Sequence, residues 1–198
     1  MREQIEAWEE QYASPGPLWR GPSPAFTVEG DRVLELGCGN GKTLSSIGCD
    51  FDVVGLDYSI NALNHCPTGP HLVRGNILHL PFKDKSFDTV LLHHVIQHLM
   101  MDDRIDAVKE VLRVLRPNGL LSVRTFSIRD LRFGKGIEIE NNTFRRGNGI
   151  IYHYFELNEF NELFSSFETI NIMEVVKPTR FAKSEVRAEL TGTFRRPK

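Results

Sequence analysis

A short apolar segment followed by three alternating glycines constrains the fold of this 198-residue chain more than any other feature. Residues 33–36 have the length and composition of a buried β-strand, and they lead directly into Gly37, Gly39 and Gly41. Because glycine has no Cβ atom, a turn built from these residues allows the backbone to approach a ligand closely. We expect a helix to begin near Gly41, so that strand, turn and helix N-terminus offer N–H groups to an anionic or nucleotide-like ligand.

The spacing of the glycines distinguishes between two kinds of nucleotide site. A dinucleotide-binding turn has the pattern G-x-G-x-x-G, which would put Lys42 where close helix packing needs a glycine. The chain has G-x-G-x-G instead, and Glu35 stands two positions before the first glycine. A second apolar run, residues 53–56, ends in Asp57, whose carboxylate could accept both hydroxyls of a ribose. An NAD-dependent oxidoreductase therefore fits the pattern less well.

With two later motifs, these features resemble the class I S-adenosylmethionine-dependent methyltransferases. The later motifs are residues 75–82, which precede Phe87 and Asp88, and the Leu-Arg-Pro-Asn-Gly-Leu segment at 115–120. The resemblance implies an α/β, Rossmann-like fold: a seven-stranded, mostly parallel sheet with helices on both faces and an antiparallel last strand. It also implies S-adenosylmethionine as the cofactor.

The resemblance assigns a part of the cofactor to each motif. The turn that follows Glu35 is expected to hold the amino-acid end, Asp57 the ribose, and Tyr58 and Ile77 the adenine. Asn76 stands where the family commonly has an aspartate, and its amide oxygen can still accept a hydrogen bond from the exocyclic amine. The expected cofactor residues are Glu35, Gly37, Cys38, Gly39, Gly41, Asp57, Tyr58, Asn76, Ile77 and His93.

Methyl transfer requires donor and acceptor to be held in line, and it needs a general base only when the acceptor starts protonated. The expected catalytic residues are His94, which follows the predicted fourth strand, and His153; packing or helix capping is an equal interpretation. His94 and His98 have the i, i+4 spacing of metal ligands, but no H-E-x-x-H pattern and no evident third ligand accompany them, so no metal is expected. The expected substrate residues are Tyr12, Trp19, Arg145 and Tyr152.

The pattern of apolar residues predicts a single domain over residues 1–198. Residues 1–28 are expected to form a helix and a loop. Strands are expected at 32–36, 52–57, 71–74, 87–93 and 119–126, and helices near 41–48, 59–65 and 103–115. Residues 127–153 are expected to be a lid-like insertion, because a connection of that length is usually functional. A helix at about 156–165 and two alternating runs, 167–176 and 186–195, complete the pattern.

Charge and composition narrow the choice of partners. The net charge is −2, no apolar run has membrane-spanning length and the first residues are charged, so we expect a cytoplasmic protein without membrane contact. The three cysteines never occur as C-x-x-C, which favours structural thiols. Residues 120–198 carry 13 Lys and Arg against 10 Asp and Glu, too small an excess to indicate RNA on its own.

We therefore expect methyl transfer to an unidentified acceptor, most simply a small molecule, by a monomer or a homodimer. A tRNA base is one alternative, because residues 152–160 resemble a segment of tRNA wobble-uridine methyltransferases. Tellurite-resistance-type methyltransferases, which act on small molecules, resemble the general sequence pattern of this chain equally well. Another alternative is a non-catalytic partner subunit that binds S-adenosylmethionine.

Overall fold

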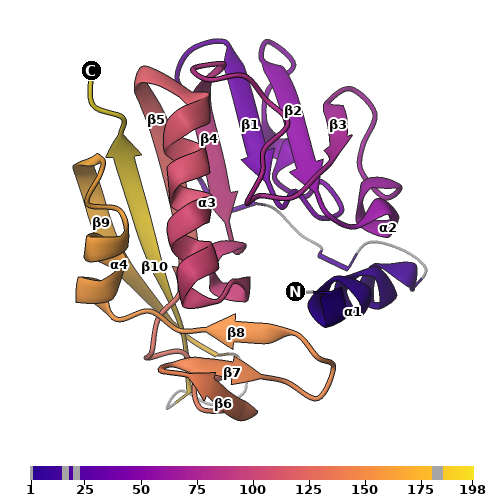
Figure 1. The fold of residues 1–198 in the computed structure, drawn as a ribbon, viewed down its shortest axis with the longest axis vertical. Helices are drawn as coiled ribbons and strands as arrows, with labels where there is room; N and C mark the ends of the chain where they lie inside the picture. Colours follow the sequence, from indigo (N-terminus) through magenta and orange to yellow (C-terminus); the bar gives the residue numbers. More distant parts are fainter. Residues whose placement is uncertain (1, 15–17, 20–22, 180–184) are drawn as a thin grey trace.

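The computed structural model describes residues 2–14, 18–19, 23–179 and 185–198. Its main sheet has the order β3 (His71–Arg74), β2 (Asp52–Asp57), β1 (Arg32–Leu36), β4 (Phe87–His93), β5 (Leu115–Phe126), β10 (Val186–Arg195), β9 (Glu168–Pro178). The five strands from β3 to β5 are parallel, whereas β10 is antiparallel to both β5 and β9 (Figure 1). The predicted seven-stranded sheet with an antiparallel last strand is confirmed.

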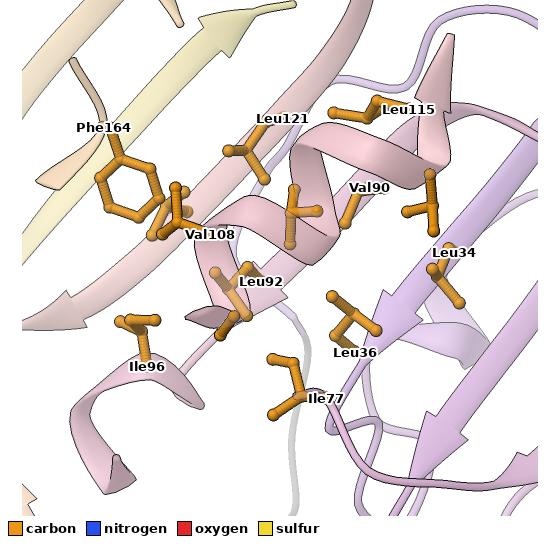
Figure 2. Packing of buried hydrophobic residues seen from close by; sticks show 14 of the residues in the cluster. Leu34, Leu36, Ile77, Val90, Leu92, Ile96, Val108, Leu115, Leu121 and Phe164 are labelled. Atoms are coloured by element: carbon orange, nitrogen blue, oxygen red, sulfur yellow. The ribbon is translucent and has the colours of Figure 1, made fainter. Parts of the chain in front are cut away.

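The main core lies between one face of this sheet and two helices, α3 (Met101–Val114) and α4 (Leu157–Leu163). Along α3 the buried residues Ala107, Val108, Val111 and Val114 recur at helical spacing and form one apolar stripe. They pack with Leu34, Leu92 and Leu121 of the sheet, and Phe164 follows α4 into the same cluster (Figure 2). This packing holds the parallel strands in register, so that their carboxyl ends meet at one edge.

The opposite face of the sheet is covered by shorter elements, the four-residue α2 (Ile60–Leu63) and a single 3-10 turn, η1 (Leu44–Ser46). The helix expected over 41–48 is therefore wrong. The segment between Gly41 and Gly48 contains Thr43, Ser45 and Ser46, and such side chains compete for the backbone. The Ser45 hydroxyl donates to the Gly41 carbonyl at 2.8 Å.

Residues 127–153, expected as a lid-like insertion, contain a second sheet of three antiparallel strands: β6 (Ile137–Glu140), β7 (Thr143–Arg145) and β8 (Ile151–His153). This sheet and the N-terminal helix α1 (Arg2–Ala13) lie below the carboxyl ends of the parallel strands (Figure 1). A 3-10 turn, η2 (Ile96–His98), lies against β8. Across the described part of the chain, no helix is long and apolar enough to cross a bilayer.

Candidate functional site

The glycine turn follows β1 in the middle of the sheet. Gly37, Gly39 and Gly41 have φ of 63°, 54° and 74°, a region that residues with a side chain rarely adopt. A Cβ atom on Gly37 would lie 2.3 Å from Val95 Cγ2, and one on Gly39 would lie 2.5 Å from Tyr12 Oη. The turn therefore needs glycine for its backbone shape and for the close approach of its neighbours.

Asp57 ends β2 beside this turn. Its Oδ2 accepts the Gly39 N–H at 2.8 Å, and its Oδ1 accepts the Ser59 N–H at 2.9 Å. Burial raises the pKa of Asp57, and these backbone hydrogen bonds oppose the rise. Each carboxylate oxygen keeps a second lone pair. The group can therefore accept further hydrogen bonds from a ligand's hydroxyls.

The three residues expected beside adenine differ in what they expose. Tyr58 follows Asp57 and is 36% exposed. Asn76 Oδ1 accepts the Leu78 N–H at 3.0 Å within its own turn. Ile77 is buried in the main core. Tyr58 is thus the one of the three that presents a broad surface, and the adenine roles of all three stay predictions.

Glu35 and Cys38 are buried beneath the turn. The Oε2 atom of Glu35 has no hydrogen-bond partner among the described residues. Burial raises the pKa of Glu35 to about 8, against hydrogen bonds from the Thr43 side chain and the Leu44 backbone. Cys38 packs in the small cluster around Leu44. Glu35 can therefore offer a buried acceptor oxygen, whereas Cys38 can meet a ligand through its backbone.

Two expected substrate residues, Tyr12 and Trp19, lie over the glycine turn. Trp19 Nε1 donates to Tyr12 Oη at 3.0 Å, and the Trp19 backbone exchanges two hydrogen bonds with the Asn40 side chain. Tyr12 is buried, whereas Trp19 is 51% exposed. This arrangement brings both residues to the proposed cofactor side of the site. Residues 20–22 of the same loop lie outside the described residues.

The sequence analysis did not identify Glu9, although hydrogen bonds to its carboxylate hold α1 against the site. Its carboxylate accepts hydrogen bonds from Ser59 Oγ at 2.7 Å and from the Ile60 N–H at 3.0 Å, and Arg74 Nη2 lies 3.3 Å away. Burial opposes ionisation, but these hydrogen bonds outweigh it and lower the pKa of Glu9. Glu9 thus caps α2 from another helix. No short motif could have identified it, because its partners lie some 50 residues away in sequence.

The expected histidines occupy unlike environments. His93 is buried and contacts Ser122 Oγ through Nε2 at 3.0 Å. His94 has a positive φ of 58°, and its Nε2 lies 3.7 Å from Glu189 Oε1. His153 is buried between β7 and α4, with Thr143 and Glu159 each 2.8 Å from one ring nitrogen. His153 therefore has no exposed nitrogen to offer a substrate, and its expected catalytic role gains no support from this location.

Five ring-bearing residues meet beside the turn and form the aromatic cluster: Trp8, His94, His98, Phe126 and Tyr152. The His98 ring makes edge contacts with Trp8 and Tyr152, at 4.9 and 4.8 Å between centroids. His94 packs on Phe126 at 5.1 Å. Trp8 also stacks on Tyr12, which covers Gly39. The cluster therefore borders the glycine turn and includes the expected substrate residue Tyr152.

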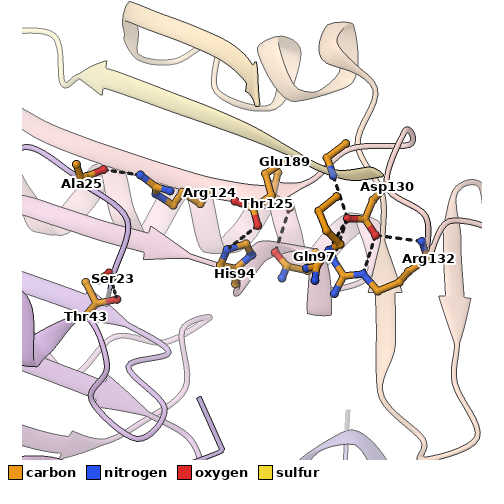
Figure 3. A network of polar contacts seen from close by, with 12 residues as sticks. Ser23, Ala25, Thr43, His94, Gln97, Arg124, Thr125, Asp130, Arg132 and Glu189 are labelled. Carbon is orange, nitrogen blue, oxygen red and sulfur yellow. Dashed lines mark hydrogen bonds and ion pairs between the residues drawn. The ribbon is translucent and has the colours of Figure 1, made fainter. Parts of the chain in front are cut away.

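Arginines border this cluster, but the expected Arg145 is exposed on β7 away from it. The next residue, Arg146, has its Cζ 5.1 Å from the Tyr152 ring centroid. Arg132 Cζ lies 3.9 Å from the Phe126 ring centroid. Arg146 follows the last residue of β7, and the substrate role of Arg145 stays a prediction. Figure 3 shows His94 between Arg124 and the ion pair of Arg132 with Asp130.

Part of the chain matches a known domain family. Residues 34–123 match the model of a methyltransferase domain. A S-adenosylmethionine-dependent methyltransferase of Methanosarcina mazei has the same fold: 22% identity, a TM-score of 0.70, and coverage of 86% of this chain and 94% of that one. Residues 34–123 thus resemble a methyltransferase domain, the fold is that of a methyltransferase, and the predicted resemblance is confirmed.

Two curated relatives differ in the acceptors that their names give. The tRNA N(3)-cytidine methyltransferase METTL2 of Danio rerio is 29% identical over 154 residues, 68% of this chain and 44% of its own. The fatty-acid O-methyltransferase of Mycolicibacterium smegmatis is 37% identical over 111 residues, 52% of this chain and 39% of its own. The chain spans about two fifths of the length of the curated relatives it matches.

Proposed function

We propose that this chain binds S-adenosylmethionine at the glycine turn and transfers its methyl group to an acceptor beside the aromatic cluster. The observation that carries the proposal is the pairing of the turn with Asp57 at the carboxyl ends of β1 and β2, where open parallel sheets bind ligands. The polar groups present fit this cofactor. The unpartnered Oε2 of Glu35 suits an ammonium group, and the Asp57 oxygens suit two ribose hydroxyls.

In this proposal the protein's own residues position the cofactor and the acceptor relative to each other. S-adenosylmethionine supplies an electrophilic methyl group on a sulfonium. Asp57 and the glycine turn would hold the nucleoside and amino-acid ends, and Trp19 with Tyr12 would shield the turn from water. The aromatic cluster would then orient the acceptor in line with the methyl group, and such orientation can lower a reaction barrier by about 7–11 kcal/mol.

Calorimetric titration with S-adenosylmethionine and S-adenosylhomocysteine tests the proposal. Asp57→Asn keeps the shape of the side chain but removes its charge and one acceptor oxygen. A hydrogen bond to a charged group contributes about 1.5–3 kcal/mol, so we expect affinity to fall at least about 10-fold. Asp52→Asn, at the other end of β2, is the matched control. Equal affinities of the two variants would contradict the assignment of Asp57.

The acceptor proposed is a small molecule, because the aromatic cluster is compact and the net charge of the chain is −2. A tRNA base is the alternative, supported by the name of the Danio rerio relative. Methylation of bulk tRNA by radiolabelled cofactor, compared with a small-molecule panel, separates the two. The cytoplasmic location, the single domain, the monomer or homodimer and the non-catalytic subunit stay predictions.

A further inference from the structure

In the aromatic cluster Phe126 is buried, whereas Tyr152 is half-buried. The Phe126 and Tyr152 rings are nearly parallel, with 23° between their planes and 6.5 Å between their centroids. Arg132 lies against the first ring and Arg146 against the second. Aromatic and guanidinium planes favour stacking with a planar partner. Tyr152 and Arg146 therefore favour a flat ring as their neighbour.

Two polar atoms at this cluster are buried without a hydrogen-bond partner among the described residues, Arg146 Nε and His94 Nδ1. Leaving a buried polar atom unpaired is energetically unfavourable. An arginine nitrogen can only donate, so Arg146 Nε requires an acceptor atom. His94 also holds a positive φ, a strain that clusters at functional sites. Arg146 Nε is thus available to a ligand that carries an acceptor oxygen, whereas Nδ1 of a neutral His94 whose Nε2–H faces Glu189 can only accept.

Positive charge exceeds negative charge around these atoms. Arg124, Arg132, Arg187 and Lys42 all act on His94 electrostatically. Asp130 accepts hydrogen bonds from both Arg132 and Arg187, at 2.6 and 3.0 Å, and Glu189 lies 3.7 Å from His94. These two carboxylates cannot neutralise the four cations and Arg146 as well. A bound anion would be stabilised here.

The nearby histidines are poor proton acceptors. Burial lowers the pKa of His94 to about 3, with Arg124 adding to the effect, and burial lowers the pKa of His98 to about 4. A general base works best with a pKa near the working pH. An acceptor that is already deprotonated at neutral pH avoids this requirement. Among biological acceptors, a carboxylate meets that condition.

We propose that the methyl acceptor is a carboxylate on a flat aromatic ring, with the ring beside the half-buried Tyr152 and the carboxylate bound by Arg146. One carboxylate oxygen forms a bond to the methyl carbon while the bond from that carbon to sulfur breaks. The electron pair of the broken bond stays on sulfur, giving a methyl ester and a neutral sulfide, and no proton moves. This inference rests on the proposed function.

The test uses the full chain saturated with S-adenosylhomocysteine, whose binding is measured first. Absence of that binding would overturn the proposed function itself. Calorimetric titration then compares matched pairs: benzoate with benzamide, and indole-3-acetate with indole-3-acetamide. Octanoate and cytidine serve as an acid without a ring and a ring without an acid. We expect each aromatic acid to bind at least about 10-fold more tightly than its amide, octanoate or cytidine.

Arg146→Gln is expected to remove the preference for acid over amide while S-adenosylhomocysteine still binds. Arg129→Gln is the matched control, because Arg129 is exposed and pairs with Glu174 at 2.8 Å outside the cluster. Equal binding of acid and amide, binding of neither, or tighter binding of octanoate or cytidine would each overturn the proposal. So would the same acid preference in the Arg146 and Arg129 variants.

Discussion

The glycine turn and the aromatic cluster adjoin each other, but the chain builds them in different ways. The turn comes from consecutive residues after β1 and is fixed by backbone conformation and by Asp57. The cluster is made of side chains from α1, η2, β5, β8 and the segment after β4. A local segment can thus specify the cofactor side, whereas the acceptor side depends on the packing of α1 and the small sheet.

The largest expected effect is at the turn. Gly39→Val should abolish measurable binding of S-adenosylhomocysteine, because a side chain at φ 54° is strained and its Cβ would lie 2.5 Å from Tyr12 Oη. Calorimetric titration measures the loss. Normal affinity in this variant would mean that the turn is not the cofactor site.

The variant Gly134→Val tests backbone strain without the steric clash that is expected at Gly39. Gly134 also has a positive φ, 75°, but none of the described residues has an atom within 4 Å of the position of its Cβ. We expect this variant to lose about 1–2 kcal/mol in free energy of unfolding from the left-handed backbone alone. Its cofactor affinity should stay that of the parent protein.

The contrast between turn and cluster also explains what the sequence could predict. Gly37 to Gly41 and Asp57 form a local pattern with its own physical signature, and the family that this pattern resembles implied the seven-stranded sheet. The three strands of the small sheet have only three or four residues each, too few for alternation to emerge. Arg146 was separable from Arg145 only once the register of β7 was known. The partners of Glu9 are set by tertiary packing.

A smaller effect is expected at Glu9, whose hydrogen bonds hold α1 against α2. Glu9→Ala removes the hydrogen bonds to Ser59, Ile60 and Asn61, and hydrogen bonds to a charged group contribute about 1.5–3 kcal/mol each before the groups left behind are rehydrated. We expect α1 to exchange its amide hydrogens at least about 10-fold faster. Hydrogen exchange followed by mass spectrometry measures this, and cofactor affinity should fall with it.

Glu10→Ala is the control for this contact, since Glu10 is exposed on the next position of α1. The pH dependence provides a second readout. The pKa of Glu9 is lower in the folded protein, so its contribution is complete above the ordinary value of 4.5 and is lost as pH falls below it. Protection of α1 that is the same at pH 3 and pH 7 would contradict the role of Glu9.

The smallest expected effect concerns His98, a member of the aromatic cluster that borders the glycine turn. Burial lowers its pKa to about 4, although Nδ1 bonds to the Ile151 carbonyl at 2.7 Å. The unfolded chain therefore binds the proton first, and stability present above pH 6.5 is lost as pH falls toward 4. From pH 7 to pH 5.5 we expect His98 to account for about 1 kcal/mol in urea unfolding. His98→Gln should remove that loss, and His71→Gln, whose side chain is 77% exposed, should not. Identical pH dependence in both variants would show that the cluster does not hold His98 neutral.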